Sequence, residues 1–334
     1  MEFLDLFAGI GGFRLGMEMA GHHCIGFCEI DKYARKSYQA IHQTKGEIEL
    51  HDITSVSNEF IRSIGHTDIL CGGFPCQAFS IAGKRQGFAD TRGTLFFEIA
   101  RFTAILRPRF LFLENVKGLL NHERGATFET ILRTLDELGY DVEWACLNSK
   151  AYVPQNRERV FIIGHSRAER TPQIFPLIRE DKPVIHPKKG IIVVGKLPEK
   201  YQQSSRVFST DSLSPTLTTK VDSPKILVRK SNQQVERVYP GDSVNLSYPN
   251  SQTRRGRVGK QVAHTLLTSD NQAVITDHYQ IRKLTPRECW RLQGFPDWAF
   301  ERAAKVNSET QLYKQAGNSV TVPVIFDIAR QLKN

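Results

Sequence analysis

A cysteine and a glutamate follow two apolar segments of the sequence and could do covalent chemistry together. Cys76 comes after the run Ile69-Leu70-Cys71 and a Gly-Gly-Phe-Pro turn, and Glu114 follows the near-continuous apolar run 109–113. Such runs are typical of strands in a parallel sheet, where ligands bind beyond the carboxyl ends. A thiolate at that edge is a nucleophile, and a carboxylic acid beside it is a proton donor. The alternative is that Cys76 is a small apolar core residue.

Two arginines precede a further predicted strand, residues 160–164. Arg157 and Arg159 are two positions apart, so in an extended chain they point to the same side and could both face a phosphate or a base. Between the two apolar runs, the polar segment 80–88 contains two glycines and two basic side chains. It is either a lid that closes over the site or a plain surface loop.

The start of the chain predicts the elements that would hold a nucleotide-like ligand. We expect a buried strand over residues 2–7, a glycine-rich turn over 8–12 and a helix over 13–20, which is how a nucleotide-binding βαβ unit begins. Arg14 stands where the dinucleotide fingerprint needs glycine or alanine. The match to a nicotinamide or flavin site is therefore imperfect.

Acidic residues end the next two predicted strands. Glu29 lies at the end of strand 23–30, the position from which such folds bind ribose hydroxyls. Asp52 follows strand 47–50 and could accept a hydrogen bond from an adenine amino group or cap the helix that follows.

The strand–helix alternation stops near residue 165, and this predicts the domain organisation. We expect a catalytic and cofactor-binding domain over 1–165 and a second, smaller, irregular β-rich domain over 166–280. In the remaining segment, 281–334, Thr285 and Pro286 predict the start of a helix. We expect this segment to return to the first domain.

The positive charge of the chain lies downstream of a nearly neutral first half. The net charge of the chain is +10; residues 1–165 hold 18 Lys and Arg against 20 Asp and Glu, whereas residues 166–280 hold 18 against 10. Arg254, Arg255 and Arg257 form the densest basic cluster. This distribution favours nucleic-acid binding by the second domain; the alternative for the cluster is an exposed, solvated loop.

Composition excludes several classes of protein. No apolar run approaches the roughly 18 residues that a membrane helix needs, and the first residues do not resemble a signal peptide. The six cysteines form no C-x-x-C pair, so neither a zinc site nor a disulfide framework is indicated. We expect a metal-free protein of a reducing, cytoplasmic compartment.

Six motifs in order identify a family. The chain contains DLFAGIGGF, FPCQAFS, ENVKG, QNRERVFIIG, RECWRLQGFPD and QAGNSV. In these it resembles the DNA (cytosine-5-)methyltransferases of the bacterial restriction–modification type, over nearly the whole chain except 166–280. The resemblance implies an α/β, Rossmann-like, doubly wound sheet that uses S-adenosylmethionine, with a β-rich target-recognition domain.

The resemblance also implies the roles of single residues. Cys76 would attack carbon 6 of a cytosine, Glu114 would protonate ring nitrogen 3, and Arg159, with Arg157, would hold the base and support the cysteine. Asn318 and Val320 belong to a C-terminal motif that completes the cofactor pocket. The residues that the resemblance assigns to the cofactor are Phe7, Gly9, Gly11, Glu29, Ile30, Asp52, Pro75, Leu95, Asn318 and Val320.

The implied substrate is double-stranded DNA with the target cytosine swung out of the helix. Contacts to DNA are expected from Ser80, Lys84 and Arg85 in the lid, from the basic cluster, and from a Thr-Leu pair. Two pairs fit that pattern, Thr216-Leu217 and Thr265-Leu266. We expect a monomer whose cognate restriction endonuclease is a genetic rather than a physical partner.

Three alternatives remain open at this point. A tRNA cytosine methyltransferase shares the catalytic motifs but usually has a shorter insert than 166–280. A catalytically silent DNA-binding regulator would not need both Cys76 and Glu114. A nicotinamide-dependent oxidoreductase fits only the first 30 residues.

Overall fold

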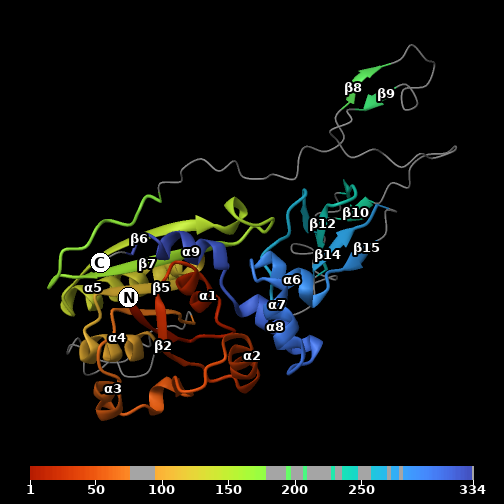
Figure 1. Cartoon of the computed structure of the whole chain (residues 1–334). Helices are drawn as coiled ribbons and strands as arrows, with labels where there is room; N and C mark the ends of the chain where they lie inside the picture. Colours follow the sequence, from red (N-terminus) through yellow and green to blue (C-terminus); the bar gives the residue numbers. More distant parts are fainter. Residues whose placement is uncertain are drawn as a thin grey trace. The chain divides into compact units, whose positions relative to one another are not determined.

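Contacts divide the chain into two units, which are described separately (Figure 1). The computed structural model describes residues 1–75, 95–177, 193–196, 206–208, 227–229, 235–246, 257–268, 272–277 and 281–332. Unit 1 comprises Met1–Ile178, Gln261–Gln272 and Lys283–Asn334, and unit 2 comprises Arg179–Lys260 and Ala273–Arg282. The described residues 261–268, which the sequence analysis grouped with the second domain, belong to unit 1.

A seven-stranded sheet forms the centre of unit 1 in the described residues. Its strands are β1 (Glu2–Leu6), β2 (His23–Cys28), β3 (Ile48–Leu50), β4 (Ile69–Gly73), β5 (Phe110–Val116), β6 (Tyr140–Asn148) and β7 (Glu158–Ser166). Their order is β3-β2-β1-β4-β5-β7-β6. Strands β1 to β5 are parallel and β7 is antiparallel to β5 and β6. The carboxyl ends of β1 to β5 thus share one edge with the amino end of β7, and the predicted α/β class is confirmed.

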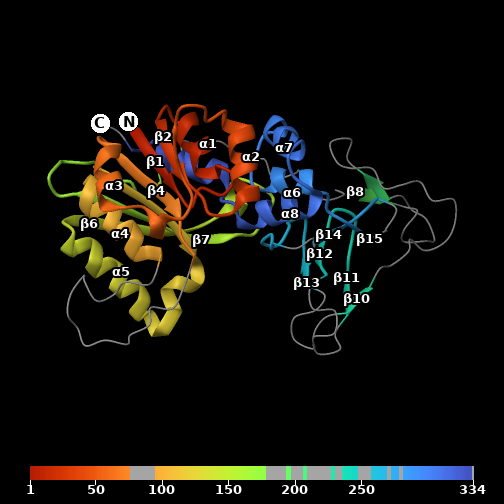
Figure 2. The ribbon, with the colours of Figure 1, turned by 90° about the horizontal axis from the view of Figure 1, so that it is seen from below.

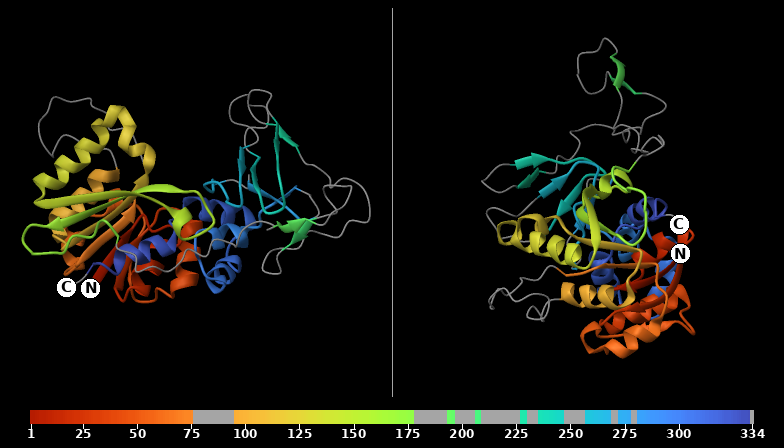
Figure 3. Two further views of the ribbon diagram at one scale, coloured as in Figure 1. Left: turned by 90° about the horizontal axis from the view of Figure 1, so that it is seen from above. Right: turned by 90° about the vertical axis from the view of Figure 1, so that its left-hand side faces the viewer.

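Helices cover both faces of this sheet (Figures 2 and 3). Side chains alternate along β1, so Leu4 and Leu6 pack against α3, α4 and α5 whereas Phe3 packs against α1 and α9. The helices of unit 1 are α1 (Gly12–Met19), α2 (Lys32–His42), α3 (Asn58–Ile64), α4 (Leu95–Leu106), α5 (Ala126–Glu137), α6 (Pro286–Leu292), α7 (Asp297–Ala304), α8 (Glu309–Asn318) and α9 (Val322–Ala329), with 3-10 turns η1 (Ile53–Ser55), η3 (Lys117–Gly125) and η4 (Ser149–Ala151).

Local sequence signals explain where several helices begin. Asp31 caps α2 by accepting hydrogen bonds from the amides of Tyr33 and Ala34, and Ser57 caps α3. At α6, Thr285 and Glu288 form a capping box and Pro286 occupies the first turn. The predicted start of that helix is confirmed.

The C-terminal segment packs against the first helix through α9. An added Cβ on Gly16 of α1 would lie 2.6 Å from the Cβ of Ile325 in α9, so only glycine permits this close approach. Ile325 and Ile328 are fully buried. The packing brings the turn between α8 and α9 back to the edge of the sheet where β1 ends.

Unit 2 consists of short strands with a small core. It contains β8 (Val193–Lys196) paired with β9 (Arg206–Phe208), and β10 (Leu227–Arg229) paired with β11 (Val235–Arg237). A four-stranded sheet has the order β13-β12-β14-β15, from β12 (Ser243–Asn245), β13 (Arg257–Gly259), β14 (Gln272–Ile275) and β15 (Ile281–Lys283). Val238, Val244 and Ile275 form its buried cluster. The expected β-rich second domain is confirmed, although several of its segments lie outside the described residues.

No helix in the described part of the chain combines the length and apolar character required to cross a membrane.

Candidate active site

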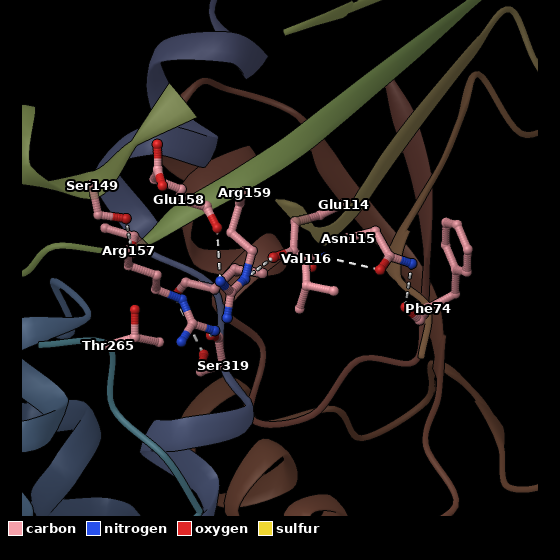
Figure 4. Close-up of polar contacts among 12 residues, drawn as sticks. Phe74, Glu114, Asn115, Val116, Ser149, Arg157, Glu158, Arg159, Thr265 and Ser319 are labelled. Carbon is pink, nitrogen blue, oxygen red and sulfur yellow. Dashed lines mark hydrogen bonds and ion pairs between the residues drawn. The ribbon is translucent and has the colours of Figure 1, made fainter. Parts of the chain in front are cut away.

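A buried ion pair joins β5 and β7 at the shared edge of the sheet (Figure 4). The Nε of Arg159 lies 2.9 Å from Oε1 of Glu114, and the two side chains are only 15% and 10% exposed. Burial raises the pKa of Glu114, while the positive charges of Arg159 and Arg157 act in the opposite direction. The carboxyl group is therefore protonated at a higher pH than an ordinary glutamate, as a proton donor requires.

Glycine permits β4 to approach both of its neighbours at this edge. An added Cβ on Gly73 would lie 2.9 Å from Oε2 of Glu114, and one on Gly72 would lie 2.1 Å from the carbonyl oxygen of Leu6. The two glycines are part of β4 rather than of a turn after it, because the strand continues to Gly73. The end of β4 is consequently held directly beside Glu114.

Asn115 ties the ends of β4 and β5 together, and the sequence analysis did not single it out. Its buried amide nitrogen donates a hydrogen bond of 2.9 Å to the carbonyl oxygen of Phe74, two residues before Cys76. Its position next to Glu114 at a strand end was the available signal. Cys76 itself lies outside the described residues, as do Ser80, Lys84 and Arg85.

The two arginines that were expected to point the same way have different partners. Arg157, immediately before β7, donates hydrogen bonds to the carbonyl oxygens of Ser319 (2.5 Å) and Gly317 (3.4 Å). Arg159 instead donates to the carbonyl oxygen of Glu158 and pairs with Glu114. Figure 4 shows both guanidinium groups in the same region.

The turn after β1 has a backbone suited to a ligand. Phe7, Gly9 and Gly11 have φ values of 53°, 56° and 83°, and a non-glycine residue in this region stores strain of a kind found at binding sites. An added Cβ on Gly9 would have nothing within 4 Å, whereas one on Gly11 would lie 2.0 Å from Nε2 of His42. His42, whose burial lowers its pKa to about 3, thus supports the turn as a neutral ring.

Glu29 lies beside this turn, just beyond the end of β2. Its Oε2 accepts a hydrogen bond of 2.8 Å from the amide of Gly9, and its Oε1 accepts one of 2.7 Å from the amide of Asp31. Burial raises the pKa of Glu29, while these two amide bonds lower it. Each carboxyl oxygen keeps a further lone pair, so the group can also accept from ligand hydroxyls.

The other expected cofactor residues lie around the same edge. Asp52 caps η1 by accepting from the amide and hydroxyl of Thr54, which lowers the pKa of its carboxyl group. Ile30 is 69% exposed. Pro75 and Asn318 are exposed, Leu95 is partly buried and Val320 is buried beside the first helix.

Of the basic cluster expected to contact DNA, Arg257 lies within the described residues, and it is exposed at the start of β13. Thr216, Leu217, Arg254 and Arg255 lie outside the described residues. The other Thr-Leu pair lies in unit 1, where Thr265 donates a hydrogen bond of 2.8 Å to the carbonyl oxygen of Asn156 and Leu266 is buried. Across the described ranges, no group of three His, Cys, Asp or Glu side chains could hold a metal ion.

This arrangement agrees with the comparison to protein families. The family model of the C-5 cytosine-specific DNA methylase matches residues 1–334. The chain belongs to this family. The resemblance inferred from the six motifs is thereby confirmed, and with it the enzyme class, DNA (cytosine-5-)methyltransferase.

Named relatives of this methylase include restriction–modification enzymes. It is 36% identical to the type II methyltransferase M.DsaV of Dactylococcopsis salina, over 99% of this chain and 86% of the relative. It is 39% identical to the type II methyltransferase M.HpaII of Haemophilus parainfluenzae, over 97% and 86%. The crystal structure of the S. pombe Dnmt2 methyltransferase has the same fold, with a TM-score of 0.59, 17% identity and coverage of 99% and 97%.

Proposed function

We propose that this methylase transfers a methyl group from S-adenosylmethionine to carbon 5 of one cytosine within a specific short sequence of duplex DNA. The observation that carries the proposal is the buried Glu114–Arg159 pair beside the end of β4, which leads into Cys76. A proton donor, a cation and a nucleophile at one edge of a sheet are what the reaction requires.

The residues around the β1 turn fit S-adenosylmethionine. Glu29 offers acceptors for ribose hydroxyls, Asp52 offers one for the adenine amino group, and the exposed Ile30 offers an apolar surface for the adenine ring. Open space beside Gly9 leaves room for the methionine portion. The remaining proposed contacts are Phe7, Gly11, Pro75, Leu95, Asn318 and Val320. The bound cofactor supplies an electrophilic methyl group.

Cys76 and Glu114 would make the cytosine ring reactive. Carbon 5 of cytosine is too weak a nucleophile by itself, so the thiolate of Cys76 adds to carbon 6 while Glu114 gives a proton to nitrogen 3. Electron density then moves to carbon 5, which takes the methyl group. Loss of the proton on carbon 5 to a base, breakage of the bond between Cys76 and carbon 6, and return of the nitrogen 3 proton to Glu114 restore the aromatic ring. Arg159 orients Glu114 and carries positive charge next to the developing enamine.

Recognition of the DNA sequence is assigned to unit 2. Residues 166–280 hold 18 Lys and Arg against 10 Asp and Glu, and the basic residues include Arg254, Arg255 and Arg257. Lysine and arginine side chains that contact phosphates release counterions, so binding should weaken steeply as salt concentration rises. Swinging the target cytosine out of the helix costs a few kcal/mol for unstacking. The lid residues Ser80, Lys84 and Arg85 would then close over the flipped nucleotide.

The biological setting follows from the relatives. M.DsaV and M.HpaII are both named type II methyltransferases. These names support a role in protecting DNA from a cognate restriction endonuclease, which need not bind the enzyme. We further propose a cytoplasmic monomer of bacterial or phage origin.

Two experiments test the proposed reaction. Bisulfite sequencing of plasmid DNA incubated with the enzyme and S-adenosylmethionine should reveal one recurrent sequence with a protected cytosine. A duplex carrying 5-fluorocytosine at that position should then trap a covalent complex, because fluorine cannot leave as a proton would.

Cys76→Ser is the control for the covalent step, and it should form no adduct. tRNA incubated under the same conditions should remain unmethylated. Methylation of tRNA with no change in the DNA, or full turnover by Cys76→Ser, would contradict the proposal.

A further inference from the structure

Arg157 is buried without a carboxylate partner that could balance its charge in the described residues. It is 3% exposed, its Nη atoms donate to the carbonyl oxygens of Gly317 and Ser319, and its Nε has no partner among those residues. Burial and the nearby charge of Arg159 lower the pKa of Arg157 to about 9. Moving a guanidinium group out of water costs free energy unless it makes hydrogen bonds. The bonds that Arg157 makes to backbone carbonyl oxygens therefore show which segment of the chain it holds in place.

The segment held by Arg157, called the 317–320 turn, comprises the last two residues of α8 and the two residues that follow it. An added Cβ on Gly317 would lie 2.2 Å from the carbonyl oxygen of Leu267, so the turn packs tightly on its outer side. On its inner side, an added Cβ on Gly12 would lie 2.8 Å from both Ser319 Oγ and Val320 Cγ2. The turn is therefore fitted between the segment around Leu267 and the glycine-rich turn that follows β1.

Hydrogen bonds after the turn also connect it to the rest of unit 1. The hydroxyl groups of Ser149 and Thr321 lie 2.8 Å apart, and Thr321 donates a hydrogen bond to Oε1 of Gln293. These contacts fix the start of α9, whereas Arg157 donates hydrogen bonds to the two carbonyl oxygens on either side of Asn318. Asn318 itself is exposed and free to face a ligand.

We propose that Arg157 is a positioning residue for the cofactor: it holds the turn 317–320 in the shape that presents Asn318 and Val320 to S-adenosylmethionine. The proposal rests on the cofactor site proposed above. The two arginines of the QNRER motif then have different roles. Arg159 serves Glu114 and the base, and Arg157 joins the same strand end to the cofactor pocket.

The two roles give different results in the absence of DNA. If Arg157 positions the turn, its loss weakens cofactor binding by the protein alone. If it holds the base instead, cofactor binding without DNA is unchanged and only turnover falls. Affinity for S-adenosylhomocysteine, measured by calorimetry on the full chain without DNA, distinguishes these cases.

The variants are Arg157→Met, Arg157→Lys and Arg167→Met. Arg167 is the matched control, because it immediately follows β7 as Arg157 precedes it, and it clasps Asp136 and Asp141 at the opposite edge of the sheet. We expect Arg157→Met to weaken S-adenosylhomocysteine binding by about tenfold or more, since hydrogen bonds from a charged group are lost. Arg157→Lys should be intermediate, and Arg167→Met should bind as the wild type does.

If Arg157→Met fails to fold, a substitution within the turn itself provides a second test. Gly317→Ala leaves Arg157 intact but pushes the turn away from Leu267, so it should also weaken binding of S-adenosylhomocysteine. In assays with S-adenosylmethionine, Arg157→Lys should raise KM for the cofactor more than it lowers kcat.

Wild-type affinity in Arg157→Lys and Gly317→Ala would overturn this inference and leave the proposed reaction standing. Failure of the wild-type protein to bind S-adenosylhomocysteine would instead contradict the cofactor site itself.

Discussion

The cofactor side and the base side of this methylase lie at the same edge of one sheet but hold their carboxyl groups differently. At the end of β2, Glu29 is oriented by neutral backbone amides of Gly9 and Asp31. At the end of β5, Glu114 is oriented by the guanidinium group of Arg159. Burial raises the pKa of both groups, and the second is in direct contact with a cation.

The difference reflects what each carboxyl group has to do. A group that binds hydroxyls must stay in place and accept hydrogen bonds, and amide donors orient it without adding charge. A group that donates a proton must exist as both acid and carboxylate during the reaction. Burial makes the acid form accessible, and the neighbouring arginine stabilises the carboxylate that remains after the proton has gone.

The comparison predicts the largest effect for the proton donor. Glu114→Gln keeps the shape of the side chain but cannot deliver the proton, so kcat should fall by about 10²–10⁴-fold. Affinity for S-adenosylhomocysteine should stay close to that of the wild type. Single-turnover methylation and calorimetry measure the two quantities; a normal rate would remove Glu114 from its role.

A smaller effect, on binding rather than on rate, is expected at the cofactor side. Glu29→Gln replaces one acceptor oxygen by a donor, which would repel either the amide of Gly9 or that of Asp31. KM for S-adenosylmethionine should rise by about tenfold, and kcat at saturating cofactor should change little. Equal losses in kcat for Glu29→Gln and Glu114→Gln would contradict the distinction between the two sides.

The pH dependence of the rate should identify the titrating side. Glu114 must be protonated to act and its pKa is raised by burial, so kcat/KM should fall as pH rises through that pKa. The decline is up to tenfold per pH unit for a single group. The residual activity of Glu114→Gln should lack this decline. If the decline in kcat/KM with pH persisted in Glu114→Gln, another group would be responsible for it.

The smallest effect is expected for an exposed ion pair near the base side. Lys117 and Glu158 lie 2.9 Å apart and their side chains are 54% and 45% exposed. Because water and salt screen such a pair, Lys117→Met should leave the melting temperature of the protein close to that of the wild type. Thermal unfolding checks this. Arg159→Met, which removes the buried ion pair with Glu114, is the comparison variant. If Lys117→Met lowered the melting temperature as much as Arg159→Met does, exposure would not explain the difference between the two ion pairs.

Much of this protein could be predicted from its sequence because the signals are local. Apolar runs predicted β1, β4 and β5, and Thr285 with Pro286 predicted the start of α6. The motifs identified the family. Boundaries were less exact: β5 continues through Val116, so Glu114 and Asn115 belong to the strand. Strand pairing with β7 extends it beyond its apolar core.

Other features depended on contacts between distant segments. Asp52 was expected either to cap a helix or to bind adenine, and the structure shows the cap at η1 while leaving the carboxyl group near the sheet edge. Periodicity placed Arg157 and Arg159 on one side of an extended chain. The partners of Arg157 are Gly317 and Ser319, which lie 160 and 162 positions further along the sequence. The partner of Arg159 is Glu114, which lies 45 positions before it.

The sequence by itself determined the family, the sheet and the strand ends near Glu29 and Glu114, because hydrophobic runs and short motifs act over a few residues. Only the tertiary structure decided which partner each charged side chain takes. Hydrogen bonds and burial depend on which groups packing brings within about 3 Å, and no local pattern contains that distance. The separate surroundings of Arg157 and Arg159 are the clearest result of this dependence.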